Sequence, residues 1–446
     1  MHCGVMVTGY NQDDWERLMT EDYDRPPTRS DASLPATRTT AMTAASTAPV
    51  VNEMPRLISV DDHVVEPADL WQSRLPAKYK DVGPRIVIAP QGEIKLVKGA
   101  WQETPGDGDK MAAWWHYEDH RYQIKQLIAC PGLAPEEVSS QGVTYDDIAP
   151  GCYQPKARIA DMDKNHIEAS LCFPNYPRFC GQLFSERKDL ELGRLCVEAY
   201  NDWMIEEWCG DSDGRLIPLC MVPIWDVELA AAEIRRNAAR GCRAVCFSEL
   251  PAWLGKPSIE SGYWDPFLEA CEETETVIAM HIGSGTKTVV PADESPQLVN
   301  ANLIACNSIA SMISWLFSGK LIQFPKLKLL YAESQIGWIP YFVERADDTW
   351  RTHQWAQEET RIPEPPSTYY RRNVFNCFFK DTVGIDMIDR IGVDNVLFET
   401  DYPHQDGTFP HSKKVAENLF GHLDPESVYK IARGNAIELL GLDLEA

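Results

Sequence analysis

Ile58-Ser59-Val60-Asp61-Asp62-His63-Val64-Val65-Glu66-Pro67 is a short apolar run that leads directly into three potential metal ligands and a proline. This pattern predicts a β-strand that carries a site at its end. Side chains alternate between the two faces of a strand, so Asp61 and His63 point to one side and Asp62 to the other. One backbone segment can therefore offer a carboxylate oxygen and an imidazole nitrogen to the same cation. Acidic residues that merely begin a loop are the alternative for this stretch taken alone.

Short apolar runs recur from residue 168 onward and alternate with amphipathic stretches. The predicted strands are Leu57–Val60, Ala169–Phe173, Leu216–Val222, Ala244–Phe247, Val277–Ile282, Leu327–Ala332, Val374–Phe379 and Val396–Phe398. The predicted helices cover about 186–208, 226–240, 262–274, 302–319, 337–355, 382–391, 411–420 and 425–440. Eight strand–helix alternations predict the α/β fold of a parallel (β/α)8 TIM barrel. Asp424 and Pro425 are suited to begin the last helix, and Gly441 is suited to end it.

Two segments stand outside this pattern. Residues 1–54 show neither helical nor strand periodicity, which predicts a flexible N-terminal extension before a barrel domain of residues 55–446. Residues 68–160 are rich in Trp, Tyr, Pro and Gly and have little regular period, which predicts an aromatic-rich insertion after the first strand. Its rings serve either ordinary packing or a lid over an aromatic substrate. The aromatic residues in question include Trp71, Trp101, Trp114, Trp115 and Tyr117.

Composition limits the class of partner. The chain has 446 residues, 44% of them hydrophobic, and no apolar run long enough to cross a bilayer, so no membrane partner is expected. The formal net charge of −25 repels phosphate backbones and argues against a nucleic acid partner. A small-molecule substrate remains, and a homo-oligomer is left open. The 13 cysteines include no Cys-x-x-Cys pair, and no secretory signal is visible, so a cytoplasmic protein with buried thiols is expected.

In a parallel barrel the residues that follow each strand meet at one rim, where catalysis takes place. Polar residues follow three further strands in the segments His281-Ile282-Gly283-Ser284-Gly285, Ala332-Glu333-Ser334 and Glu399-Thr400-Asp401-Tyr402-Pro403-His404. Two imidazoles and two carboxylates would then hold one divalent metal ion, with zinc favoured and manganese as the alternative. The predicted ligands are Asp61, His63, His281 and Asp401. A hydrogen-bonded histidine at a strand end is the alternative for His281 alone.

These motifs resemble the second amidohydrolase family, which includes aminocarboxymuconate semialdehyde decarboxylase and resorcylate decarboxylases. The resemblance covers about residues 56–442 and is most specific at Phe317-Ser318-Gly319, at Ala332 to Pro340, at Thr400 to His404 and at Gly434-Asn435-Ala436. It implies a barrel with one divalent metal at Asp61, His63, His281 and Asp401. Many relatives carry histidine at the position of Asp61. Many decarboxylating relatives place a proton-donating histidine where this chain has Glu333.

Two activities follow from this set of residues. Hydrolysis is the first interpretation, with a water activated at the metal attacking a carbonyl of a small, aromatic or apolar substrate and Asp401 taking its proton. Non-oxidative decarboxylation of an aromatic or unsaturated acid is the alternative. Glu333 is expected to orient the substrate or move a proton without being an essential metal ligand, or else to pair with Arg345. His404 is expected to act as a proton donor or as a partner of a ligand, or to be a loop residue.

Overall fold

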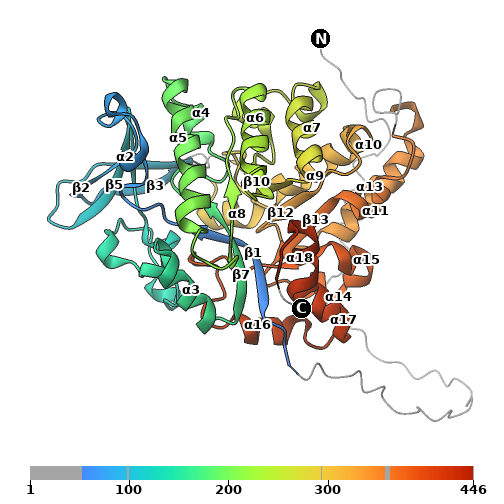
Figure 1. The fold of residues 1–446 in the computed structure, drawn as a ribbon. Coiled ribbons are helices and arrows are strands. Elements are labelled where there is room, and N and C mark those ends of the chain that lie inside the picture. Colours follow the sequence, from blue (N-terminus) through green and yellow to red (C-terminus); the bar gives the residue numbers. More distant parts are fainter. Residues whose placement is uncertain (1–52, 98–99, 293, 357–361, 445–446) are drawn as a thin grey trace, which may run out of the picture. The chain divides into compact units, whose positions relative to one another are not determined.

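The computed structural model describes residues 53–97, 100–292, 294–356 and 362–444 (Figure 1). The predicted extension of residues 1–54 lies outside these residues, apart from its last two positions. Met54 is buried in the hydrophobic core, and its carbonyl oxygen lies 3.0 Å from Nε2 of His166. The packed part of the chain therefore begins no later than Met54.

Parallel strands form the centre of the described chain. They are β1 (Leu57–Val64), β7 (Ile167–Pro174), β8 (Leu216–Ile217), β9 (Leu219–Cys220), β10 (Ala244–Phe247), β11 (Val277–His281), β12 (Leu329–Ala332), β13 (Val374–Phe378) and β14 (Val396–Phe398). One sheet has the order β1-β7-β8 and the other β14-β13-β12-β11-β10-β9. Their residues are buried almost throughout, which explains why the strands read as continuous apolar runs and not as alternating ones.

The ladder of paired strands is not the single closed ring that the sequence predicts. The run 216–222 forms two short strands on either side of Pro218, which has no N–H to donate to a ladder. β8 pairs with β7, whereas β9 pairs with β10. The first strand and the segment after the last one are joined by backbone hydrogen bonds, from Asp401 N to Asp61 O (3.0 Å) and from His63 N to Tyr402 O (2.6 Å).

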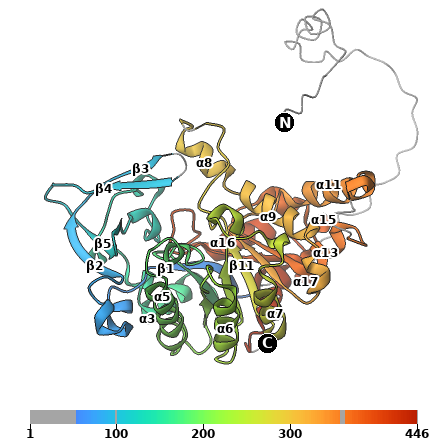
Figure 2. The ribbon, with the colours of Figure 1, turned by 90° about the horizontal axis from the view of Figure 1, so that it is seen from above.

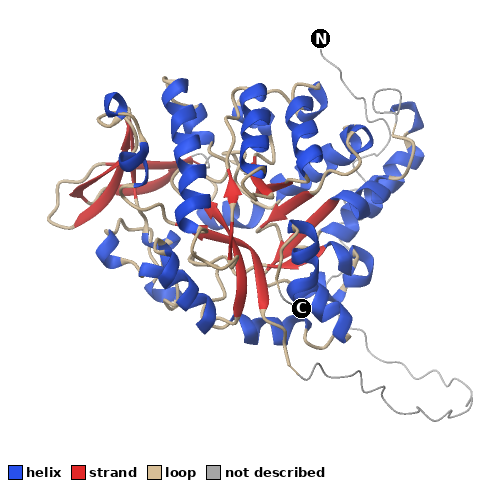
Figure 3. Cartoon of the chain, in the orientation of Figure 1, coloured by secondary structure: helices blue, strands red, loops and turns tan. Residues whose placement is uncertain are grey.

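Helices surround the parallel strands (Figure 3). They are α2 (Leu70–Arg74), α3 (Pro155–Lys164), α4 (Gln182–Ser185), α5 (Leu190–Trp203), α6 (Val227–Ala238), α7 (Asp265–Thr274), α8 (Gln297–Leu303), α9 (Cys306–Phe317), α10 (Lys320–Gln323), α11 (Ile339–Thr352), α13 (Pro366–Asn373), α14 (Thr382–Asp386), α15 (Ile388–Ile391), α16 (Ser412–Phe420), α17 (Pro425–Tyr429) and α18 (Asn435–Leu440). The predicted ends of the last helical stretch are confirmed. The Asp424 side chain accepts hydrogen bonds from Glu426 N and Ser427 N, and Gly441 has a φ of +60°.

The segment between β1 and β7 has more regular structure than its sequence predicts. It contains β2 (Arg85–Pro90), β3 (Glu93–Val97), β4 (Ala100–Thr104), β5 (Met111–Tyr117) and β6 (His120–Gln123). These strands form antiparallel sheets of the order β2-β5-β6 and β3-β4, which lie to one side of the parallel strands (Figures 1 and 2). The sequence has little regular period here because short antiparallel hairpins with mixed polar and aromatic residues leave none.

The aromatic residues of this segment that can be placed are packing residues. Trp71 and Trp115 are buried and contact each other edge to face, with ring centroids 5.1 Å apart. Trp115 also stacks on Tyr176 at 4.7 Å, and Trp71 contacts Phe184 at 6.1 Å. The side chain of Trp101 lies outside the described residues. Packing is thus the better interpretation of the described rings, since they join the insertion to the loops that follow β7.

Two predictions from composition are tested by the described residues. In that part of the chain, no helix is long and apolar enough to cross a membrane. All twelve described cysteines are free thiols, and most of them are buried.

Candidate metal centre

The structure brings the predicted ligands together near the ends of three parallel strands. Asp61 and His63 come from β1, His281 ends β11, and Asp401 follows β14. One ligand atom each of Asp61, His63, His281 and Glu333 lie within 4.8 Å of one another, and the same holds for His63, Glu333, Asp401 and His404. The predicted alternation on β1 is also confirmed, because Asp62 faces away from this cluster toward Ser170 and Thr400.

The carboxylates of this cluster lack ordinary partners. Both side-chain oxygens of Asp61 and of Asp401 are buried and accept no hydrogen bond from any described residue. Burial, with neighbouring carboxylates as a second cause, raises the pKa of both side chains well above the usual value. A buried carboxylate oxygen that accepts no hydrogen bond destabilises the folded protein unless a cation or a proton binds it.

The two imidazoles face each other. Nδ1 of His281 lies 2.6 Å from the carbonyl oxygen of Ile282 and must donate to it, which leaves a lone pair on Nε2. This Nε2 lies 3.1 Å from Nε2 of His63. Burial, together with the nearby His404 and His281, lowers the pKa of His63 well below its usual value, so its ring is held neutral. Two imidazoles and two carboxylates without hydrogen-bond donors fit a divalent cation between them.

Glu333 lies at the same rim and is a member of both groups. It follows β12, has a φ of +57°, and places Oε2 3.1 Å from Nε2 of His281. Its backbone N–H donates to Oε2 of Glu399 at 3.0 Å. The alternative of an ion pair with Arg345 is wrong, because Arg345 pairs with Asp348 at 2.8 Å. Glu333 therefore faces the cluster and not the helix surface.

His404 is held against the same ligands. Its ring stacks on His63 with centroids 3.8 Å apart, and its Nδ1 lies 2.9 Å from Oδ1 of Asp401. Nε2 lies 3.2 Å from Oδ1 of Asn175, whose Nδ2 donates to the carbonyl oxygen of Val64. Since the Asn175 amide oxygen can only accept, His404 must carry its proton on Nε2. Burial lowers the pKa of His404 to about 4.

Asp62 fixes the turn that carries Asp401. Asp401 has a φ of +51°, a strained value for a residue other than glycine. Oδ1 of Asp62 accepts hydrogen bonds from Oγ1 of Thr400 (2.5 Å) and from the N–H of Tyr402 (3.0 Å), the two residues that flank Asp401. The buried Arg158 donates from Nη2 to the carbonyl oxygen of His63 at 2.5 Å. The first strand thus holds the last ligand in place.

Two buried carboxylates near the site are not among the predicted site residues. Glu66 accepts hydrogen bonds from the N–H groups of Asn175 and Tyr176, both at 2.9 Å, and so fixes the turn after β7. Glu249 accepts from Gly283 N (2.9 Å) and from Oγ of Ser308 (3.0 Å) and holds the turn after His281. The rule that polar residues follow an apolar strand applies to Glu249 just as it does to Glu333, and it would have found this residue.

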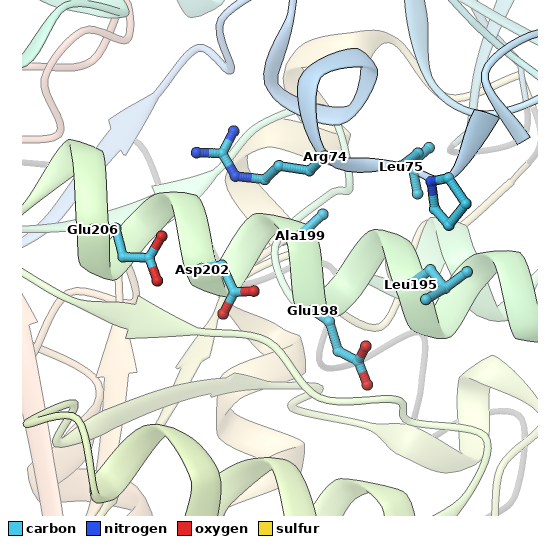
Figure 4. A pocket seen from close by; sticks show the side chains of 8 residues that line it. Arg74, Leu75, Leu195, Glu198, Ala199, Asp202 and Glu206 are labelled. Atoms are coloured by element: carbon cyan, nitrogen blue, oxygen red, sulfur yellow. The ribbon is translucent and has the colours of Figure 1, made fainter.

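A surface hollow of about 270 Å³ lies elsewhere, along α5 (Figure 4). Glu198 and Asp202 line it, with Arg74 on the opposite side, and none of the predicted site residues takes part. Its carboxylates already have partners, since Glu198 pairs with Arg194 and Asp202 with Arg236. The hollow therefore offers no chemistry comparable to that of the strand-end cluster.

A family model described as amidohydrolase matches residues 113–442, well over half of the chain. The chain belongs to the amidohydrolase family. The match begins within the insertion, so β1 with Asp61 and His63 lies ahead of it. As a member of this family, the chain is an enzyme of the hydrolase or carboxy-lyase type. Its strand-end cluster is suited to bind metal.

Individual relatives of this amidohydrolase are distant. It is 23% identical to the gamma-resorcylate decarboxylase of Polaromonas sp. strain JS666 over 354 residues, which are 73% of this chain and 98% of that protein. An amidohydrolase structure from Mycobacterium avium subsp. paratuberculosis K-10 is 24% identical and gives a TM-score of 0.66, covering 87% of this chain and 99% of that one.

A third relative is a structure of dihydroxybenzoic acid decarboxylase from Polaromonas sp. JS666 with bound manganese and the inhibitor 2-nitroresorcinol. It is 16% identical and gives a TM-score of 0.57, with coverage of 88% of this chain and 98% of that one. At these identities the two solved structures establish the likeness of the fold alone.

Proposed function

We propose that this amidohydrolase is a metal-dependent carboxy-lyase that removes carbon dioxide, without an oxidant, from a small aromatic or unsaturated acid. The observation that carries the proposal is a pair of overlapping strand-end groups, Asp61, His63, His281 and Glu333 in one and His63, Glu333, Asp401 and His404 in the other. The side-chain oxygens of Asp61 and Asp401 accept no hydrogen bond from any described residue. The named decarboxylases among the relatives favour this reaction over the hydrolysis that the sequence puts first.

Asp61, His63, His281 and Asp401 would hold the metal. When bound, a divalent cation supplies positive charge that can neutralise and orient a substrate carboxylate and an adjacent oxygen. We favour manganese over the zinc expected from the sequence. The carboxylates of Asp61 and Asp401 offer hard oxygen ligands, and a related structure contains manganese.

Glu333 is the proposed proton donor. Its side chain is 16% exposed, so it can exchange protons with solvent while Oε2 faces the cluster. In the reaction the bond between the ring carbon and the carboxyl carbon breaks, carbon dioxide leaves, and the electron pair left on the ring carbon takes the proton of Glu333. Glu333 then recovers a proton from water, which completes the cycle.

We propose roles for two further residues, His404 and Phe179. His404 is held neutral with its proton on Nε2, so Nδ1 presents a lone pair to Oδ1 of Asp401 and would share a proton or a cation with that oxygen. The half-buried Phe179 stacks on His281 with ring centroids 4.0 Å apart and would offer an aromatic face to a flat substrate.

We also infer that the two parallel sheets close into one (β/α)8 barrel. The backbone hydrogen bonds between Asp61 and Asp401 and between His63 and Tyr402 support closure at one side. At the other side β8 and β9 are separated by Pro218 alone, which is consistent with one interrupted strand. Closure would place all four ligands on one rim.

Hydrolysis of an ester, amide or activated carbon–carbon bond is the second candidate, and Glu333 is the observation that favours it. Asp61, Asp401 and Glu333 bring three carboxylates to one cluster. Their combined charge disfavours an anionic substrate relative to a neutral one. A carboxylate at this position is also suited to accept a proton from water.

Product analysis in deuterium oxide separates the two reactions. Protein loaded with manganese is incubated with a panel of dihydroxybenzoic and carboxylated methoxyphenol acids, and separately with aryl esters and lactones. We expect release of carbon dioxide from at least one acid and one deuterium at the vacated ring carbon, with both lost in His281→Ala. Hydrolysis of esters or lactones with no carbon dioxide from any acid would contradict the decarboxylase assignment.

A further inference from the structure

A second group of potential ligands lies next to the first. One ligand atom each of Asp61, Cys377 and Glu399 lie within 4.8 Å of one another. The three side chains come from β1, from β13 and from the residue that follows β14, and all three residues are 0% exposed. Glu399 is two residues before Asp401, which places this group beside the first one.

Each carboxylate of this group has at least one oxygen that accepts no hydrogen bond from a described residue. Oε2 of Glu399 accepts hydrogen bonds from Glu333 N (3.0 Å) and from Sγ of Cys377 (2.6 Å), whereas Oε1 accepts none from any described residue. Both oxygens of Asp61 are bare as well, so Asp61 can give one oxygen to each of two ions. Buried oxygens without partners are exceptions that call for a bound group.

Charge gives an independent reason for a second cation. Asp61, Asp401, Glu333 and Glu399 supply four carboxylates, and among the described residues no lysine or arginine forms an ion pair with any of them. Glu333 is partly exposed and carries the proton that it is proposed to donate, so one divalent ion would leave Asp61, Asp401 and Glu399 with an uncompensated charge of about −1 in a buried site, which is unfavourable. A second divalent ion balances these three carboxylates together with the thiolate of Cys377. The competing solution is protonation, and burial raises the pKa of Glu399 to about 8.

We propose that Asp61, Cys377 and Glu399 form a second cation site beside the first, with Asp61 shared between the two. A thiolate and two carboxylates suit zinc or cobalt(II) better than manganese, because thiolate is a soft ligand. Binding breaks the S–H bond of Cys377, whose proton goes to solvent as the sulfur binds the ion. The site is independent of which reaction the first site performs.

Cobalt(II) is the probe, because a cobalt–thiolate bond gives charge-transfer absorption in the near ultraviolet that carboxylate and imidazole ligands do not. The full-length protein is stripped with a chelator, reloaded with cobalt(II) and freed of excess metal. Bound metal is counted by elemental analysis, and the near-ultraviolet spectrum is recorded. We expect two cobalt ions per chain and a thiolate band.

Variants assign the band to this site. Cys377→Ser should lose the band and one of the two ions, and Glu399→Gln should lower the count to one as a second route to the same result. Cys246→Ser, a fully buried strand cysteine whose Sγ donates to the carbonyl oxygen of Cys220, is the matched control and should behave as the parent. His281→Ala should lose the first ion and keep the band.

Three results would overturn the second site. One cobalt per chain without a thiolate band in the parent would show a single site, with protonation of Glu399 as the solution to the charge, and would leave the first site standing. Two ions and an unchanged band in Cys377→Ser would exclude Cys377 as a ligand. Loss of the band together with the first ion in His281→Ala would show that no separate ion is held by Cys377.

Discussion

At the scale of single residues, the orientation of two imidazoles defines the site. Nε2 of His63 and Nε2 of His281 lie 3.1 Å apart, and the carbonyl oxygen of Ile282 fixes the proton of His281 on Nδ1. At this separation a proton or a cation lies between the two nitrogens. The bare oxygens of Asp61 and Asp401 on the same rim favour the cation.

His281→Ala is predicted to lose most of the bound metal, because it removes a ligand that no neighbouring side chain replaces. Losing an outer partner of a ligand typically weakens metal binding by about 10–100-fold, so losing the ligand should cost at least that much. His353→Ala, at the end of α11, is the control and should keep the metal content of the parent. Elemental analysis of both variants after identical reloading measures this, and equal retention would rule out the ligand assignment.

Glu333→Gln keeps the shape of the side chain and removes its charge and its proton. If Glu333 moves a proton in the reaction, turnover should fall by about 10²–10⁴-fold while metal content stays near that of the parent. Steady-state rates and elemental analysis on the same preparation give both numbers. Loss of metal would make Glu333 a ligand, and unchanged turnover would leave it with no catalytic role.

At the scale of elements, buried carboxylates fix the turns that carry the site. Glu66 follows β1 and accepts two backbone N–H groups of the turn after β7, where Asn175 contacts His404. Asp62 accepts a backbone N–H group of the turn around Asp401, and Glu249 accepts one of the turn after His281. Each turn that presents a site residue is thus held by a carboxylate from a neighbouring strand, which limits the movement of that residue.

Glu66 also predicts a dependence of stability on pH. Burial raises the pKa of Glu66 to about 7 from its usual 4.5, so the folded protein keeps a proton that the unfolded chain releases. The stability due to this proton is present in full below pH 4.5 and is lost as the pH rises through about 7.

Glu66→Gln removes this titration. The free energy of unfolding of the variant relative to the parent should therefore rise between about pH 5 and pH 8, by up to about 3 kcal/mol. Because glutamine offers one acceptor in place of two, the variant should start about 1–3 kcal/mol less stable at the low end of this range. Urea unfolding across the range measures both effects, with the exposed Glu269→Gln as control. Parallel curves for the variant and the parent would contradict the assignment.

The positions of the parallel strands could be predicted from the sequence, because these strands are buried on both faces and therefore appear as continuous apolar runs. Val396–Phe398 and Ala244–Phe247 are strands at the predicted residues. The interruption at Pro218 could have been expected from its missing N–H. The hairpins of residues 85–123 could not, since each strand is short and pairs only with its neighbours in an insertion whose sequence has no period.

The site was predictable to the extent that it follows strand ends. His281 and Glu333 lie at the ends of apolar runs and Asp401 shortly after one, and the structure groups Glu333 with each of the other two. The residues that orient these side chains could not be predicted from the sequence. Asn175 and Asp62 act through hydrogen bonds between strands far apart in sequence, and neither the contact of Asn175 with His404 nor that of Asp62 with Tyr402 leaves any local signal.

At the scale of the whole molecule, residues 1–52 are predicted to be dispensable for folding and metal binding, because their composition offers no apolar face to bury. The truncated chain should begin at Glu53, since Met54 is already part of the core. Soluble yield, melting temperature and metal content of this chain should match those of the full-length protein. A melting temperature lower by more than about 4 °C would indicate a loss of roughly 3 kcal/mol or more and would contradict the prediction.

The net charge of −25 acts against an acidic substrate at long range, which makes the metal the main source of attraction for a carboxylate. The central claim is therefore that one divalent ion binds among Asp61, His63, His281 and Asp401. Anomalous diffraction from crystals loaded with manganese, recorded on both sides of the manganese absorption edge, tests this most directly. We predict a peak within bonding distance of these four side chains. A peak only at other residues, or none at full manganese loading, would contradict the account.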